Sequence, residues 1–289
     1  MQGKDPMQKK QPANTQPTSL TSCSTQSQAL SDIDPEILSK WAALSNTEIV
    51  EGVISRGIKL VQLDLIESFN GIAKYQSILC LAFKFTEKGK HRRNHYHNVH
   101  HCYAVAKQCN SYLRSSNELT LSKEEELALY LAALFHDYNH SGKSLAKIED
   151  KENINNAIIG LLTFQLELTK LKFGISDEID VDYIIDQATS AIKSTMVKLV
   201  DGKVVFGKKP NTNIKAVLRD SDVTMMLDPF GRLLMPGLAK EFGMPYDENF
   251  KLSSINFQKK VKLYTDAACK TREEQMPYLE KTWAITVGL

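Results

Sequence analysis

Apolar residues recur every three or four positions along most of the chain from Pro35 onward, which is the spacing of one face of an α-helix. Asp34 adds a start signal, because Asp is a preferred capping residue and the proline after it fits the first helical position. The pattern predicts helices over residues 35–45, 47–56, 60–67, 71–86, 95–115, 122–139, 151–171, 179–195, 213–227, 232–242, 248–268 and 271–286.

One segment has a different period. Residues 197–206 (VKLVDGKVVF) alternate around Asp201-Gly202, and an Asp-Gly pair between two short apolar runs is typical of a β-hairpin. No internal repeat, heptad run or proline-rich linker interrupts the rest of the sequence. We therefore predict an all-α fold with one small hairpin, forming a single domain over residues 31–289.

The first thirty residues are rich in Gln, Ser, Thr and Pro and have almost no apolar periodicity. Such a segment buries too little apolar surface to offset the entropy lost on ordering. We predict that residues 1–30 form a flexible tail.

Composition narrows the class of protein. The chain has 289 residues, 42% of them hydrophobic, which is enough for a sizeable core, and its net charge of +2 argues against nucleic-acid binding through overall charge. No apolar stretch approaches the roughly 20 residues that a membrane helix needs, and no apolar signal sequence follows the N-terminus. Five scattered cysteines without CxxC spacing suit a reducing compartment. We expect a soluble cytoplasmic protein, although export by a route without such a signal stays open.

The histidines are concentrated in one region. All seven lie between His91 and His140, five of them within residues 91–101 (HRRNHYHNVHH) and two within residues 136–140 (HDYNH). His97 and His101 are four residues apart, as are His136 and His140, so on helices each pair would point from one face. Two such helices packed together would present imidazoles to one pocket, which suits a divalent cation.

Asp137 follows His136 at the end of the apolar run 127–135, so both side chains are expected in the interior. A buried carboxylate needs a partner, because an isolated one costs several kcal/mol or becomes protonated. A metal ion is one such partner. An internal His–Asp hydrogen bond that serves only the fold is the other.

A later acidic residue adds to the candidate site. Asp222 has Leu218 four positions before it and Met226 four positions after it, which places it on the apolar face of its helix. Asp220 remains a second candidate for the inward-facing carboxylate. A surface ion pair between Arg219 and Asp222 is the alternative without a functional role.

These motifs resemble those of a known family. Residues 96–101 (YHNVHH) look like the YHNxxH motif of class I cyclic nucleotide phosphodiesterases, and residues 136–142 (HDYNHSG) are similar to the family's HDxxHPG, with Ser141 in place of proline. Residues 221–224 (SDVT) stand where the family has its ADLS or ADLC segment. The order of these motifs is also that of the HD-domain metallohydrolase superfamily. The resemblance implies a phosphodiesterase-like helical bundle with a metal-dependent phosphoric diester hydrolase activity.

The resemblance also implies a role for each matching residue. Asp137 would bridge a first ion to a second one, Mg²⁺ or Mn²⁺, and His140 would hold the water around the second ion from outside. A hydroxide between the two ions would attack phosphorus in line, and His97 would be the general acid that protonates the departing alkoxide. The first ion, Zn²⁺ or else Fe²⁺ or Mn²⁺, would be bound by His101, His136, Asp137 and Asp222.

The substrate is less well defined. Tyr96 and Gln258 are the candidates for substrate contact, but Val261 stands where the family has a phenylalanine three residues after its purine-binding glutamine. A histidine pair that follows the family's HD motif is also absent. We expect a small-molecule phosphoester, with a 3′,5′-cyclic nucleotide first. A nucleoside mono- or triphosphate is an alternative substrate. A di-iron oxygenase is a more remote alternative activity. The alternative without catalysis is a nucleotide-binding relict of the fold. His91 and His95 are expected to be exposed.

Overall fold

The computed structural model describes residues 47–143, 160, 164, 179–200, 203–206 and 209–284. The predicted tail over residues 1–30, the helix predicted over residues 35–45 and nearly all of the helix predicted over residues 151–171 lie outside these residues.

The described part is helical apart from one hairpin, which confirms the predicted fold class. Its elements are α3 (Thr47–Glu67), α4 (Ala73–Thr86), the 3₁₀ turn η1 (Lys90–Arg93), α5 (Val99–Ser115), α6 (Lys123–Phe135), α8 (Val181–Thr195), β1 (Val197–Val200), β2 (Lys203–Phe206), α9 (Asn213–Thr224), the 3₁₀ turn η3 (Met225–Leu227), α10 (Pro229–Arg232), α11 (Met235–Glu241), α12 (Glu248–Lys260) and α13 (Asp266–Ala284).

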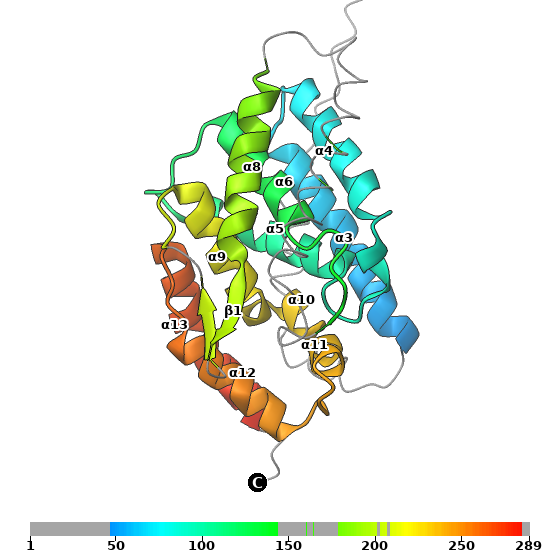
Figure 1. Ribbon diagram of the computed structural model, residues 1–289, viewed down its shortest axis with the longest axis vertical. Helices are drawn as coiled ribbons and strands as arrows, with labels where there is room; N and C mark the ends of the chain where they lie inside the picture. The colour runs from blue at the N-terminus through cyan, green and yellow to red at the C-terminus, as the bar shows by residue number, and fades with distance from the viewer. Residues whose placement is uncertain are drawn as a thin grey trace, which may run out of the picture. The chain divides into compact units, whose positions relative to one another are not determined.

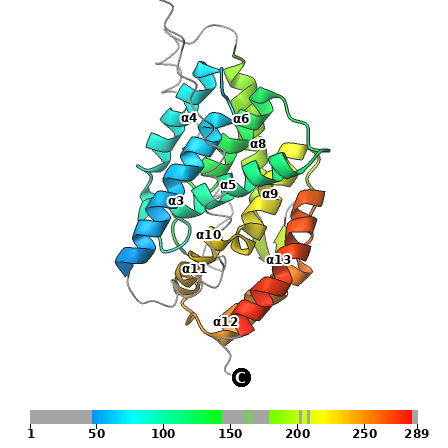
Figure 2. The same cartoon turned by 180° about the vertical axis from the view of Figure 1, so that it is seen from behind.

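Helix α6 is the central element of this bundle. Every residue from Leu127 to Phe135 is fully buried, as the unbroken apolar run predicts. α3 and α4 lie on one side of α6, α8 lies on the other, and α5 and α9 also pack against it (Figures 1 and 2). A capping box in which the Ser122 hydroxyl accepts from the N–H of Glu125 starts the helix. The end of α6 is therefore held rigidly in the core.

The hairpin strands form where the alternating pattern predicts them. β1 and β2 pair antiparallel, with Val197 opposite Phe206 and Val200 opposite Lys203. The Asp201-Gly202 turn itself lies outside the described residues. None of the described helices is long and apolar enough to cross a membrane.

Several predicted boundaries are wrong. The helices predicted over residues 47–56 and 60–67 are one helix, α3, because Gly57 does not break it and instead lies against the ring of Phe230. The helix predicted over residues 248–268 ends at Lys260. The Asp220 carboxylate explains this break, because it accepts hydrogen bonds from the N–H groups of Tyr264 and Thr265 and so fixes the turn before α13.

Candidate active site

The histidine motifs lie at the ends of helices and not along their faces. α5 begins at Val99, because the Asn98 side chain accepts hydrogen bonds from the N–H groups of His100 and His101 and caps the helix. His97 therefore precedes the helix. α6 ends at Phe135, and Asn139 has a left-handed backbone (φ 60°), so His136 to His140 form a turn. The expectation of two i, i+4 pairs on helix faces was wrong.

Four side chains nevertheless converge on one point from the start of α5, the end of α6 and α9. The Nε2 atoms of His101 and His136 are 3.1 Å apart. Asp137 Oδ2 lies 3.1 Å from the first of these nitrogens and 3.2 Å from the second. Asp222 Oδ1 lies 3.3 Å and 3.5 Å from the same two atoms. We name His101, His136, Asp137 and Asp222 the histidine–aspartate cluster.

The donor set of this cluster fits a divalent cation. His136 Nδ1 lies 2.8 Å from the carbonyl oxygen of Ala133, which only accepts, so Nδ1 carries a proton. When the ring gives up its second proton, the Nε2 lone pair is the one that faces the cluster. The two Nε2 atoms are 3.1 Å apart, so both can reach one ion. Imidazole nitrogen with carboxylate oxygen is a set that Zn²⁺ and related ions accept.

The charges in the cluster are strongly coupled. Burial acts to lower the pKa of His101 and His136, but the carboxylates of Asp137 and Asp222 outweigh it and raise both pKa values. Burial acts to raise the pKa of the two aspartates, and the histidines outweigh it and hold both pKa values below the usual range. A cation at this point would replace the protons on the imidazoles, so its affinity would fall with falling pH.

The structure distinguishes the two aspartates of α9. Asp220 is fully buried, and its Oδ2 atom accepts from the N–H and the hydroxyl of Thr265, away from the cluster. Only Asp222 of the two contacts the histidines. Arg219 is also buried, with its guanidinium 4.0 Å from the ring centre of Phe206, so it does not lie at the surface as the alternative of a surface pair with Asp222 requires.

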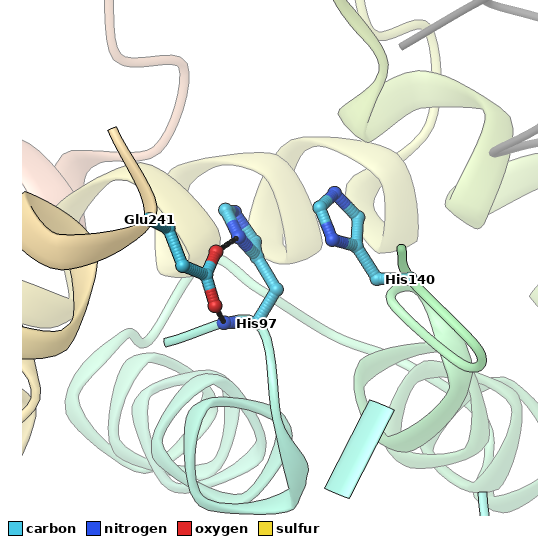
Figure 3. Close-up of side chains that lie close together, drawn as sticks. All are labelled: His97, His140 and Glu241. Carbon is cyan, nitrogen blue, oxygen red and sulfur yellow. Dashed lines mark hydrogen bonds and ion pairs between the residues drawn. The ribbon is translucent and has the colours of Figure 1, made fainter. Parts of the chain in front are cut away.

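His97, His140 and Glu241 form a second group of side chains (Figure 3). This group adjoins the cluster, because the ring centres of His97 and His101 are 5.7 Å apart. His97 Nδ1 is 2.5 Å from Glu241 Oε2, and Glu241 Oε1 accepts from the backbone N–H groups of Tyr96 (2.6 Å) and His97 (3.1 Å). Burial acts to raise the pKa of Glu241, but its hydrogen bond with His97 and the two backbone N–H groups outweigh it and lower the pKa. Glu241 is thus a carboxylate that orients and supports the His97 ring.

Sequence reasoning missed Glu241. A signal was present, because Glu241 follows Leu234 and Leu238 at spacings of seven and three, which puts it on the apolar face of α11. Glu241 therefore shows the same sequence pattern as Asp222: an acidic residue among apolar positions that face inward.

His140 completes this second group. Its ring stacks on that of His97 with centroids 4.1 Å apart and planes at 25°, and its Nδ1 accepts from the N–H of Gly142. Burial, and then the His97 charge, lower the pKa of His140 to about 4. Imidazole lone pairs lie in the ring planes, so two stacked rings direct them nearly parallel. This group is better arranged for proton transfer than for chelation.

His91 is the one histidine whose predicted environment was wrong. It is fully buried and not exposed: its Nδ1 accepts from the N–H of Asn139, and its ring packs on Tyr138. Burial lowers its pKa to about 4. His95 is exposed, as predicted.

A cavity of about 420 Å³ adjoins both groups. Its polar side includes His97, His101 and Asp222, and most of the remaining wall is apolar. Tyr96 lies at the edge of the site, with its ring 4.8 Å from that of His97 and 4.7 Å from that of His101. The apolar wall is formed mainly by Val197, Phe206, Val223, Met225, Met226, Met235, Leu238, Phe242, Met244, Phe250 and Phe257.

Gln258 also lines the cavity, from α12. Its Nε2 donates to the carbonyl of Val223 at 2.5 Å, while its buried Oε1 has no hydrogen-bond partner within the described part of the chain. An unsatisfied buried acceptor at a cavity wall is suited to a ligand donor.

Comparison with known proteins gives one family. Residues 96–147 match the family model for 3′5′-cyclic nucleotide phosphodiesterase. No curated protein matches the chain significantly.

The chain is also similar to solved structures, at low sequence identity. LmjPDEB1 in complex with IBMX shares 16% identity, with 91% of this chain and 94% of that chain covered and a TM-score of 0.47. The phosphodiesterase domain of the rhodopsin phosphodiesterase from the choanoflagellate Salpingoeca rosetta shares 17% identity, with 88% and 93% covered and a TM-score of 0.47. TM-scores below 0.5 assign no function to the chain. The predicted resemblance is confirmed over residues 96–147, the segment that carries most of the site: there the chain matches the 3′5′-cyclic nucleotide phosphodiesterase family.

Proposed function

We propose that this protein is a metal-dependent phosphodiesterase that hydrolyses 3′,5′-cyclic nucleotides. The observation that carries the proposal is a pair of imidazole nitrogens 3.1 Å apart, each within 3.5 Å of two carboxylates, beside a histidine that the Glu241 carboxylate supports. Three of the four cluster residues, and His97, lie in the segment that matches the family.

The histidine–aspartate cluster would hold the first divalent cation. When bound, divalent cations would supply Lewis-acid stabilisation of the phosphoryl oxygens and lower the pKa of a coordinated water. The two carboxylates are the groups suited to reach a second ion, because the Asp137 and Asp222 side chains are 17% and 22% exposed, whereas the two histidine side chains are each 2% exposed. Of the two, Asp137 is the one that the family resemblance makes the bridge.

His97 would act as the general acid. Its Nδ1 is engaged by Glu241, so Nε2 is the atom left to donate a proton to the leaving alkoxide. The adjoining His140 ring is neutral near pH 7, because its pKa lies at about 4, and it would limit access of water to the acid without competing for its proton.

The cavity supports a substrate with one flat apolar part and one anionic part. Its apolar wall, with four phenylalanines, would pack a nucleobase, while the Gln258 Oε1 atom would accept from a base N–H. The phosphate of the same molecule would then face the cluster.

A hydrolysis panel tests this proposal. Protein stripped of metal and then supplied with Mn²⁺ or Mg²⁺ is incubated with 3′,5′-cyclic nucleotides and, in parallel, with nucleoside mono- and triphosphates. We expect metal-dependent release of nucleoside monophosphate from the cyclic substrates. Hydrolysis of only the acyclic nucleotides would contradict the assignment and favour an HD-type nucleotide phosphohydrolase. Binding without hydrolysis of any of them would favour a non-catalytic relict.

A further inference from the structure

One side chain outside the cluster links the two loops that carry the paired histidines. Asn94 Nδ2 donates to the carbonyl oxygen of His97 at 2.9 Å and to that of His140 at 2.7 Å. A carbonyl oxygen only accepts, so both amide hydrogens of Asn94 are used and the orientation of the amide follows. Residues 43 positions apart in sequence are thus held by one amide group.

The same residue is joined to the start of α5. The backbone carbonyl oxygen of Asn94 accepts a hydrogen bond from Asn98 Nδ2 at 3.0 Å. The Asn98 Oδ1 atom in turn accepts one from the backbone N–H of His101. Asn94 therefore connects the loop before the acid, the loop after α6 and the helix that presents a cluster residue.

A glycine makes room for this arrangement. Gly142 has φ +70°, and a Cβ atom there would lie 2.7 Å from Asn94 Oδ1. Any side chain at position 142 would both strain the backbone and push against the Asn94 amide.

We propose that Asn94 is a positioning residue for the acid step, an inference that rests on the proposed function. By holding the His97 and His140 carbonyls together, Asn94 fixes the 4.1 Å ring stack and with it the direction of His97 Nε2. Asn94 is not among the described residues that line the cavity, so it acts through His97 and not through the substrate.

The leaving group separates this role from a merely structural one. A nucleoside alkoxide needs protonation as it departs, whereas p-nitrophenolate leaves without an acid. The variants are Asn94→Ala and Asn94→Asp, the second being isosteric but without N–H donors. Asn117→Asp, at an exposed position after α5, is the matched control.

We expect both Asn94 variants to lower kcat on a 3′,5′-cyclic nucleotide by roughly 10–100-fold, with KM within about 3-fold of the wild type. The rate on a p-nitrophenyl phosphodiester and the metal content should each stay within about 3-fold. His97→Ala should show the same selectivity, and Gly142→Ala a weaker form of it. An equal loss on both substrates, or wild-type kcat in both Asn94 variants, would overturn the inference.

A second measurement keeps the inference separate from the proposed function. If the wild type hydrolyses no cyclic nucleotide, the proposed function fails. The positioning role of Asn94 is then tested by the imidazole ¹⁵N and ¹³C chemical shifts in NMR spectra of the full-length, Zn²⁺-loaded protein. Asn94→Ala should shift the His97 and His140 ring signals together and leave His95 unchanged. Unchanged His97 and His140 signals would contradict the positioning role.

Discussion

At the scale of single residues, the acid and the cluster should be separable by mutation. His97→Ala removes the proposed proton donor and leaves the histidine–aspartate cluster intact. We expect kcat on a cyclic nucleotide to fall about 10²–10⁴-fold while metal content stays at the wild-type value, as measured by steady-state kinetics and elemental analysis. Wild-type turnover in His97→Ala would refute the assignment of the acid.

Glu241 should contribute through His97. Glu241→Gln keeps the shape of the side chain and an acceptor for the two backbone N–H groups, but it removes the charge beside the imidazole. We expect kcat to fall, but less than in His97→Ala, because the variant weakens the hydrogen bond that orients the imidazole and keeps the proton donor. Wild-type kcat in Glu241→Gln, measured by steady-state kinetics, would show that Glu241 does not support His97.

The two aspartates of α9 provide a matched pair. Asp222→Asn should reduce metal content at least 10-fold, since it removes a charged ligand, and should leave folding nearly unchanged. Asp220→Asn should retain metal but lower the free energy of unfolding by about 1–3 kcal/mol, because Asp220 Oδ2 accepts three hydrogen bonds around Thr265 in a fully buried site. The reverse pattern would place the ligand at Asp220.

At the scale of elements, the docking of α11 determines where Glu241 lies. A Cβ atom on Gly237 would come 2.0 Å from the carbonyl oxygen of His95, so only glycine allows α11 to approach the loop that holds His97 this closely. We expect Gly237→Ala to displace α11, to lower the free energy of unfolding by about 1–3 kcal/mol and to lower kcat together with it.

Gly52 is the matched control for this substitution. It also lies in a helix, but a Cβ atom added there would have no neighbour within 4 Å among the described residues, so Gly52→Ala should stabilise the fold by up to about 1 kcal/mol without a change in kcat. Urea denaturation and steady-state kinetics measure both effects. Equal stability changes in the two variants would contradict the close approach at Gly237.

The elements also show how far sequence patterns reach. The fully apolar run of α6 and the alternating hairpin strands each lie where their periodicity predicts. For α6 the reason is burial on all sides, which requires apolar residues at every position. The ends of helices are set by local hydrogen bonds that compete with the helical period. Asn98 starts α5 four residues late, and this places His97 before the helix and not on its face.

At the scale of the whole molecule, buried neutral histidine should make stability fall in acid. The pKa of His91 is lowered to about 4 by burial, against 6.5 for a free histidine. Between these values the unfolded chain binds a proton that the folded chain does not, so the free energy of unfolding decreases as pH falls from about 6.5 to about 4. We expect this site to contribute on the order of 3 kcal/mol over that range.

His91→Leu isolates the effect, because the readout is the pH slope of stability and not its value at one pH. Chemical denaturation of wild type and variant at several pH values between 7 and 4 should show a shallower slope for His91→Leu, while His95→Leu should keep the wild-type slope. Parallel curves for His91→Leu and the wild type would contradict a neutral buried His91.

The site as a whole combines predictable and unpredictable parts. The motifs identify His97, His101, His136, Asp137 and Asp222, and the structure brings all five to one region. The partnership of Glu241 with His97 crosses 144 positions of sequence, and spacing along one helix carries no information about such a contact. The choice between Asp220 and Asp222 likewise depends on the turn before α13, which packs on α9 from outside the motif.

The central claim is that the histidine–aspartate cluster chelates a cation. The most direct test is isothermal titration calorimetry, which measures the equilibrium binding of Zn²⁺ and Mn²⁺ to metal-stripped protein. We predict saturable binding in the wild type that weakens with falling pH and is lost in His136→Ala and in Asp222→Asn, but is retained in His97→Ala. Binding of equal strength in the wild type, His136→Ala and Asp222→Asn would contradict the claim, and so would the absence of any binding by the wild type.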